Sequence, residues 1–68
     1  MRLRVNGKLV DREGATLPLL TVLEELDVIG GRGVAVAVND EVRPRSAWPT
    51  SELHDGDEVI VLTATQGG

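Results

Sequence analysis

Residues 1–11 read Met1-Arg2-Leu3-Arg4-Val5-Asn6-Gly7-Lys8-Leu9-Val10-Asp11, and this stretch carries the strongest fold signal in the sequence. Its first five residues alternate apolar and basic side chains, which is the two-residue period of a strand with one buried face. Asn6-Gly7 follows, and both residues tolerate the positive φ angles of a type I′ turn. The chain is therefore expected to start with a β-hairpin.

Residues 17–28 come next, with leucines and valines three and four positions apart. This spacing places them in one stripe along a helix. We expect Thr16 to cap the helix and Pro18 to lie in its first turn, where the missing N–H costs little. A start at Thr21, with Glu24 at capping-box spacing, is the alternative. The alternative leaves barely two turns, so we prefer the longer helix.

Two later stretches predict further strands. Residues 34–38 are apolar at every position, which is typical of a strand at the centre of a sheet with both faces covered or contacted. Asn39-Asp40 predicts a turn, and residues 41–43 a short return strand. Residues 58–63 form the last predicted strand, after a tight turn at His54-Asp55-Gly56-Asp57.

The predicted order is strand, strand, helix, strand, short strand, strand. Such an order indicates an α+β fold, a mixed sheet of four to five strands with one main helix packed on one face. The first and last strands could lie side by side in parallel. Between the last two strands, Ser46-Ala47-Trp48-Pro49 predicts a single turn with Trp48, the one aromatic residue, as its anchor.

Length and composition exclude several classes of protein. Sixty-eight residues predict one domain, taken as residues 1–63, with residues 64–68 as a flexible C-terminal tail. The absence of cysteine excludes disulfides, a thiol nucleophile and cysteine metal sites. A net charge of −4 argues against nucleic acid or an anionic membrane as the partner. With no targeting signal and no apolar run of membrane-spanning length, a cytoplasmic location is expected.

Candidate catalytic and metal-binding residues are few. His54, the only histidine, lies in the His-Asp-Gly-Asp turn, where Gly56 at positive φ and capping carboxylates are the expected structure. If Ser46 or Ser51 were a nucleophile, His54 would be its only plausible general base in the sequence. Gly30-Gly31-Arg32-Gly33 precedes a strand, the reverse of the order in a phosphate-binding loop, and is expected to be a plain loop. We therefore expect no catalytic residue, no metal ligand and no enzyme activity in this chain.

The C-terminal Gln66-Gly67-Gly68 leaves two interpretations open. Two glycines at the end of a chain contribute no packing, and a frayed end is one explanation. A carboxylate on a thin stalk is the other, because residues without Cβ can thread a channel that would exclude any side chain. Composition alone does not decide between them.

Stretches spread over nearly the whole chain resemble one family. The resemblance is to the ubiquitin-like β-grasp family and, within it, to the ThiS family of sulfur carriers in thiamine biosynthesis. Asp-Gly-Asp and Gly-Gly alone would also suit the small subunit of molybdopterin synthase, but Pro-Arg-Ser-Ala-Trp and Gln-Gly-Gly point to the thiamine branch. The stretches concerned are Val5-Asn6-Gly7, Val36-Ala37-Val38-Asn39, Val42-Arg43-Pro44-Arg45-Ser46-Ala47-Trp48, Leu53-His54-Asp55-Gly56-Asp57-Glu58-Val59 and Thr63-Ala64-Thr65-Gln66-Gly67-Gly68.

The resemblance implies a function centred on Gly68. Its carboxylate would be adenylated by an E1-like adenylyltransferase (ThiF-like) and converted to a thiocarboxylate, which gives sulfur to a thiazole synthase (ThiG-like). ATP and magnesium would be held by the activating enzyme, and a sulfur-donor protein would supply the sulfur. The chain would be a co-substrate that binds no cofactor itself, with Gly67 and Gln66 as the threading residues.

The alternation of the last strand adds a candidate docking patch. If Val59 and Val61 face the helix, Ile60 and Leu62 point away from it, beside the root of the tail. We expect these two residues to dock the partner enzymes, together with alternate residues of the 34–38 strand. The other possibility is that the tail or a loop covers Ile60 and Leu62. A ubiquitin-like interaction module that carries no sulfur, and would tolerate loss of the glycines, also stays open.

Overall fold

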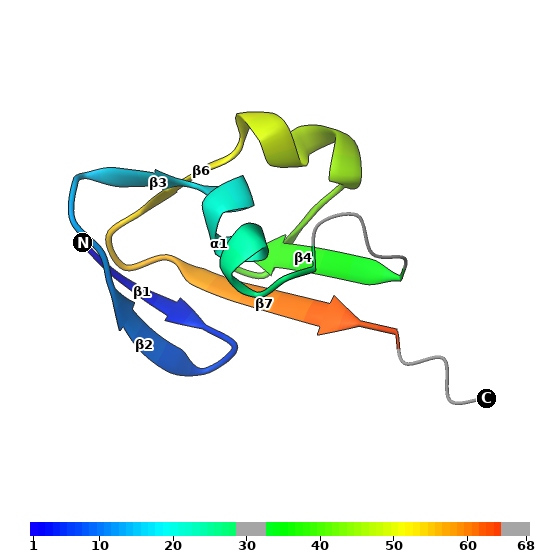
Figure 1. Cartoon of the computed structure of the whole chain (residues 1–68), viewed down its shortest axis with the longest axis horizontal. Helices are drawn as coiled ribbons and strands as arrows, with labels where there is room; N and C mark the ends of the chain where they lie inside the picture. Colours follow the sequence, from blue (N-terminus) through cyan, green and yellow to red (C-terminus); the bar gives the residue numbers. More distant parts are fainter. Residues whose placement is uncertain (29–32, 65–68) are drawn as a thin grey trace.

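The computed structural model describes residues 1–28 and 33–64, which form two sheets and one main helix. Figure 1 shows the larger sheet, in which the strands lie in the order β2-β1-β7-β4-β5. The smaller sheet pairs β3 with β6. The strand bounds are β1 (Arg2–Val5), β2 (Lys8–Asp11), β3 (Thr16–Pro18), β4 (Val34–Val38), β5 (Glu41–Arg43), β6 (Glu52–His54) and β7 (Glu58–Thr63).

The predicted turns are confirmed. β1 and β2 pair antiparallel, and Asn6 and Gly7 at their turn have φ angles of 50° and 84°. Asn39 and Asp40, between β4 and β5, have φ angles of 51° and 68°. Positive φ at both central residues is the type I′ geometry that matches the twist of a two-stranded ribbon. Gly56 has the predicted positive φ as well, at 89°.

The first and last strands pair in parallel, as predicted, which makes the sheet mixed. The ladder begins where the Arg4 N–H donates to the Asp57 carbonyl and continues where the Asn6 N–H donates to the Val59 carbonyl. After this bond the backbone enters the turn, and the next bond to β7 is made by the Asn6 side chain, whose Oδ1 accepts the Val61 N–H at 2.8 Å. The turn and the parallel ladder are thus joined at one residue.

The main helix is shorter than predicted. α1 spans Leu19–Glu25, whereas the sequence pattern predicted residues 17–28. Pro18 is the N-cap residue, with φ −61° and ψ 138°, and does not lie in the first turn. No side chain of the described residues caps this end by a hydrogen bond. The predicted cap at Thr16 is therefore wrong, and so is the alternative start at Thr21, which lies inside the helix.

The segment before α1 forms a strand that was not predicted. β3 (Thr16–Pro18) pairs antiparallel with β6 (Glu52–His54), and Leu17 lies opposite the buried Leu53. A residue that precedes proline is disfavoured from helical geometry, so this segment stays extended. At the other end, Asp27 has a φ of 59°, and the helix ends before it.

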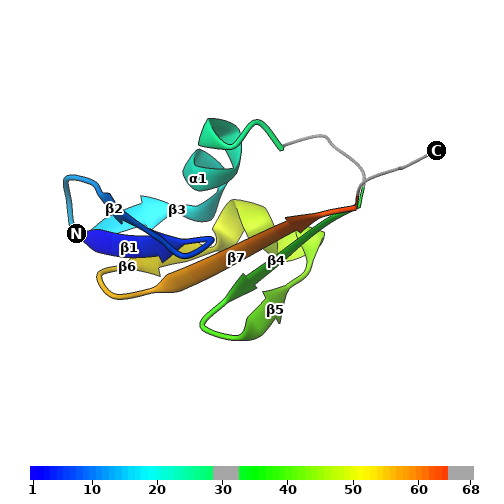
Figure 2. The ribbon, with the colours of Figure 1, turned by 90° about the horizontal axis from the view of Figure 1, so that it is seen from below.

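The core lies between the sheet and the elements on one of its faces. Figure 2 shows α1 on one side of the sheet. The predicted turn around Trp48 is η1 (Arg45–Thr50), a 3₁₀ helix, where the buried Trp48 donates from Nε1 to the Arg43 carbonyl at 2.8 Å. The core is aliphatic apart from that indole, and consists of Leu3, Val5, Leu19, Val22, Leu23, Val36, Val38, Trp48, Leu53, Val59 and Val61.

Within the described part of the chain, only one face of the 34–38 strand, predicted to have both faces covered or contacted, is covered. Val36 and Val38 are buried, but Ala35 is exposed and Ala37 only half-buried. The strand is apolar throughout, yet α1 and η1 cover a single face of the sheet. Among the described residues no helix is long and apolar enough to cross a membrane.

Candidate functional site

The C-terminal residues predicted to carry the chemistry, Gln66, Gly67 and Gly68, lie outside the described residues. The structure does describe the chain up to Ala64. β7 pairs antiparallel with β4 along its length, and the last register pair is Val34 with Thr63. One position further, the Ala64 N–H donates to the Gly33 carbonyl at 2.7 Å. The division into residues 1–63 and 64–68 stays a prediction.

The face of the large sheet that points away from α1 carries an apolar surface, which we call the open face. The register places its residues side by side: Ala37 lies opposite both Ile60 and Val42, and Ala35 lies opposite Leu62. Leu62 is 64% exposed and Val42 71%, whereas Ile60 is half-buried. The open face consists of Ala35, Ala37, Val42, Ile60 and Leu62. Leu9 lies opposite Arg4, which is itself opposite Glu58, so it stands apart from this surface.

The structure thus brings the two predicted docking residues, Ile60 and Leu62, together with alanines from the neighbouring strand. Val42 was missed in the sequence. Val42 is the single apolar residue between two charged ones in a short strand, and that pattern could have indicated a solvent-facing hydrophobic side chain. Of the four large hydrophobic residues that are exposed in the described part of the chain, Val42 and Leu62 lie on this face. A cluster of this kind favours a binding surface.

The His54–Asp57 turn is structural. The Asp57 carboxylate accepts the His54 N–H at 2.8 Å and a hydrogen from Asn39 Nδ2 at 2.9 Å, so it is engaged by the turn and by the neighbouring hairpin. His54 Nδ1 lies 3.9 Å from the same carboxylate. Within residues 1–28 and 33–64 there is no group of three His, Asp or Glu side chains that could hold a metal ion.

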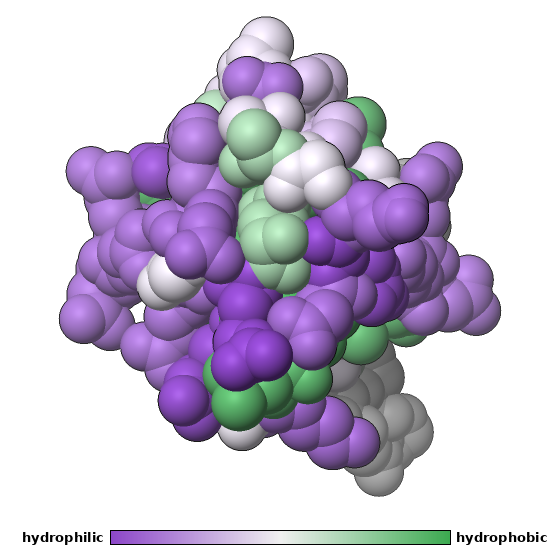
Figure 3. Space-filling model, turned by 90° about the vertical axis from the view of Figure 1, so that its left-hand side faces the viewer, coloured by the Kyte–Doolittle hydropathy of each residue, from purple (hydrophilic) through white to green (hydrophobic). Residues whose placement is uncertain are grey.

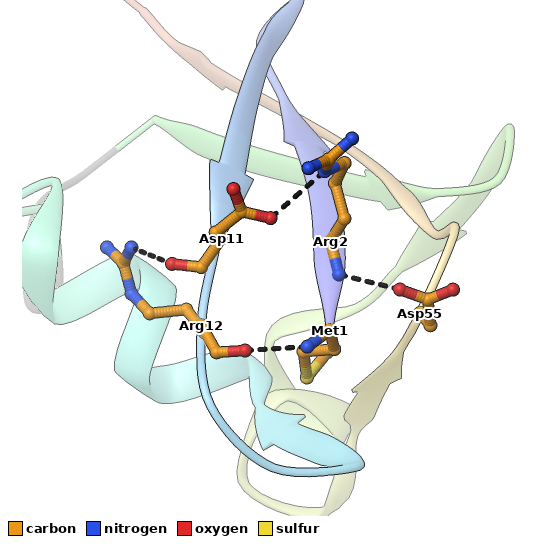
Figure 4. Close-up of polar contacts among 5 residues, drawn as sticks. All are labelled: Met1, Arg2, Asp11, Arg12 and Asp55. Carbon is orange, nitrogen blue, oxygen red and sulfur yellow. Dashed lines mark hydrogen bonds and ion pairs between the residues drawn. The ribbon is translucent and has the colours of Figure 1, made fainter.

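Charged residues gather at the end of the molecule that carries the N-terminus. Figure 4 shows Arg2 Nε donating to Asp11 at 3.0 Å, the Arg2 N–H donating to Asp55, and the Met1 ammonium donating to the Arg12 carbonyl. The hydrogen bond from Arg2, and then the charge of Arg2, lower the pKa of Asp11. The same hydrogen bond, and then the charge of Asp11, raise the pKa of Arg2. This end is mostly hydrophilic (Figure 3), in contrast to the open face.

A hollow of about 300 Å³ lies between α1 and the first hairpin. Its lining is aliphatic except for Arg12 and Glu25, which pair with each other across it. An ion pair over aliphatic side chains offers neither a nucleophile nor a free acid–base pair. The hollow therefore provides no catalytic chemistry by itself.

The sequence model of the ThiS family matches residues 3–68. The chain belongs to the ThiS family. Sulfur carrier protein ThiS of Escherichia coli (strain K12) is 34% identical over 47 residues, which cover 69% of this chain and 70% of that protein. The predicted assignment to the sulfur carriers of thiamine biosynthesis is thereby confirmed at the level of the family.

Two solved structures agree with this assignment. The crystal structure of the thiamine biosynthesis protein ThiS from Geobacter metallireducens is 38% identical, with a TM-score of 0.79 and complete coverage of both chains. The solution NMR structure of a thiamine biosynthesis protein from the same organism gives a TM-score of 0.78 and covers 100% of this chain and 88% of that one. The predicted fold, a mixed sheet with one main helix on one face, is confirmed, and it is consistent with the β-grasp.

Proposed function

We propose that this ThiS-family chain carries sulfur as a thiocarboxylate on Gly68 and delivers it for thiazole formation in thiamine biosynthesis. The observation that supports this most directly is that the family match extends through the terminal glycines to residue 68. The chain acts as a co-substrate, and the catalytic groups belong to its partners. A cytoplasmic location, expected from the sequence, stays a prediction.

The chemistry requires two substitutions. A Gly68 carboxylate oxygen attacks the α-phosphorus of ATP on an E1-like, ThiF-like adenylyltransferase, and pyrophosphate leaves. Sulfur at the oxidation level of hydrosulfide, supplied by a donor protein, then attacks the acyl carbon. AMP leaves with the bonding pair of the C–O bond, and loss of the S–H proton gives the thiocarboxylate. The first step is needed because a free carboxylate has no good leaving group, whereas the acyl adenylate has AMP. ATP and magnesium are held by the enzyme, and a ThiG-like thiazole synthase receives the thiocarboxylate.

The open face is the surface we propose for docking the activating enzyme. Leu62 lies two residues before Ala64, so a partner that covers Leu62 also lies beside the root of the C-terminal segment. Ile60 and the alanines of β4 extend this contact across two strands. An enzyme that must hold Gly68 at a nucleotide gains orientation by binding the sheet next to that root. The same argument applies to the thiazole synthase.

Two matched variants test the docking role. Leu62→Lys puts a charge on the open face, whereas Leu26→Lys makes the same change at the end of α1, on the other side of the sheet, where Leu26 is 39% exposed. We expect Leu62→Lys to raise the KM for adenylation at least tenfold and Leu26→Lys to leave it unchanged, with both domains folded by circular dichroism. Equal KM values for the two variants would refute docking through the open face.

The adenylation step is tested by ATP–pyrophosphate exchange with an activating enzyme that is active on the Escherichia coli ThiS protein. We expect exchange to depend on the full chain and to be lost when Gly68 is deleted. Deletion of Gly68 leaves a carboxylate on Gly67, one residue short, whereas Gly68→Ala keeps the length and adds one methyl group. The two variants therefore separate the need for the full reach of the chain from the need for a narrow end. If the full chain gives no exchange above that of the enzyme alone, the result would favour a docking module that carries no sulfur.

A further inference from the structure

We propose that Gly33 is a positioning residue for the C-terminal segment: its lack of a side chain leaves the space that Ala64 occupies, and its carbonyl holds the Ala64 amide. The consequence for activation rests on the proposed function. The contact itself rests on the described structure alone. Gly33 lies in the segment that the sequence indicated as a plain loop.

Among the described residues, Gly33 and Ala64 form the outermost contact between β4 and β7, at the end of β7 that leads to the C-terminal residues. The β4–β7 register ends with Val34 opposite Thr63, and Gly33 with Ala64 is the next pair outward. The Ala64 N–H donates to the Gly33 carbonyl at 2.7 Å, a short and well-formed hydrogen bond. The path of the chain into residues 65–68 therefore starts from a point that Gly33 determines.

The space at Gly33 excludes a side chain. A Cβ built there would lie 2.7 Å from the Ala64 Cβ, 3.5 Å from its backbone nitrogen and 3.6 Å from its Cα. Carbon atoms that are not bonded keep about 3.5–4.0 Å apart, so Ala64 would have to move. Gly33 also has a φ of 70°, which is strained for any residue with a side chain.

Other glycines separate these two constraints. Gly56, with a φ of 89°, has nothing within 4 Å of an added Cβ. The positive φ of Gly56 is needed only for the local turn at residues 54–57. Gly33 combines the same backbone requirement with a close approach to another segment. Replacing Gly56 by alanine therefore reproduces the backbone strain without the displacement of a neighbour.

A displaced Ala64 would change where Gly68 can reach. Gly68 is four positions after Ala64, and an extended chain spans at most about 3.3–3.6 Å per residue, so the reach from Ala64 is at most roughly 14 Å. If the sheet is docked on the enzyme, a shift at this root moves the carboxylate relative to the nucleotide. Misplacement by about 1 Å can lower a rate by up to about 100-fold. The effect should fall on kcat, because the docking surface is untouched.

The test compares Gly33→Ala, Gly56→Ala, Ala64→Gly and the double variant Gly33→Ala/Ala64→Gly. The readouts are kcat and KM for adenylation and the hydrogen-exchange rate of the backbone amide at position 64 by NMR. We expect Gly33→Ala to lower kcat about 10- to 100-fold with little change in KM, and to speed exchange at position 64. Gly56→Ala should keep kcat and the exchange rate at position 64 near those of the unmodified chain. The double variant should recover most of the lost kcat and of the slow exchange, because it removes the Ala64 Cβ, which is the atom closest to the added side chain.

Three results would overturn the inference. Gly33→Ala could match Gly56→Ala in kcat and in exchange, or lower kcat with no change in exchange at position 64. The double variant could also be as impaired as Gly33→Ala, which would assign the defect to backbone strain. If the unmodified chain is not adenylated at all, the proposed function fails. Accelerated exchange in Gly33→Ala, and its reversal in the double variant, would then still support the contact.

Discussion

At the scale of single residues, Asn6 joins two parts of the chain that are 55 positions apart. Its backbone takes the positive φ of the first turn, and its side-chain oxygen accepts the Val61 N–H. The sequence predicted the turn, because Asn-Gly is a local signal. The bond to Val61 could not be predicted, because it depends on the register between the first and last strands, which the sequence does not give.

Asn6→Gly and Asn6→Asp should differ in stability. Glycine accepts the positive φ but removes the acceptor of a part-buried N–H, which typically costs about 1–3 kcal/mol. Aspartate keeps both the conformation and an acceptor oxygen. We expect Asn6→Gly to lower the free energy of unfolding by about that amount and Asn6→Asp to lose much less, as measured by urea denaturation. Equal losses in the two variants would mean that the bond to Val61 contributes nothing.

Asp11 should give the domain a pH-dependent contribution to stability. Because Arg2 lowers the pKa of folded Asp11, this contribution is present above the unfolded pKa and is lost as the pH falls through the folded pKa. Asp11→Asn should therefore lower the urea midpoint near neutral pH and have no effect in strong acid. The control is Glu13→Gln, an exposed carboxylate between β2 and β3. A pH-independent difference for Asp11→Asn would contradict the ion pair, and added salt should weaken the effect.

At the scale of elements, the helix is the place where the sequence pattern was misleading. Leu17 fits the helical stripe, but the proline after it favours an extended backbone, and the residue pairs with Leu53 in the small sheet. The strands of that sheet are three residues each, too short to show a period. The pattern of the last strand, by contrast, predicted residues 58–63 with the bounds that the structure has.

The seven residues of α1 are too few to be stable as an isolated helix, so the helix depends on its packing. Leu23 is fully buried, whereas Leu26 at the end of the helix is 39% exposed. Leu23→Ala should lower the free energy of unfolding by about 2–5 kcal/mol and Leu26→Ala by much less, measured by urea denaturation followed by Trp48 fluorescence. Similar losses at the two positions would contradict this core arrangement.

At the scale of the whole molecule, one face of the sheet is used for folding and the other is left for contact. The alternation in β7 predicted correctly which residues point away from the helix, because buried valines alternate there with Ile60 and Leu62. In β4 the sequence predicted that alternate residues join this surface, and the structure places Ala35 and Ala37 there. Because Val and Ala are both apolar, the sequence did not reveal which of the two alternating sets faces outward. The contact between Gly33 and Ala64 joins two chain segments that are far apart in the sequence, so no local sequence pattern predicts it.

The central claim is that Gly68 becomes a thiocarboxylate. It is tested most directly by intact-mass analysis after incubation with the activating enzyme, ATP, magnesium and a sulfur donor, with the Escherichia coli ThiS protein as the positive control. We predict a mass gain equal to the replacement of one oxygen by one sulfur, absent when Gly68 is deleted. An unchanged mass for this chain, in a mixture that converts the positive control, would contradict the account.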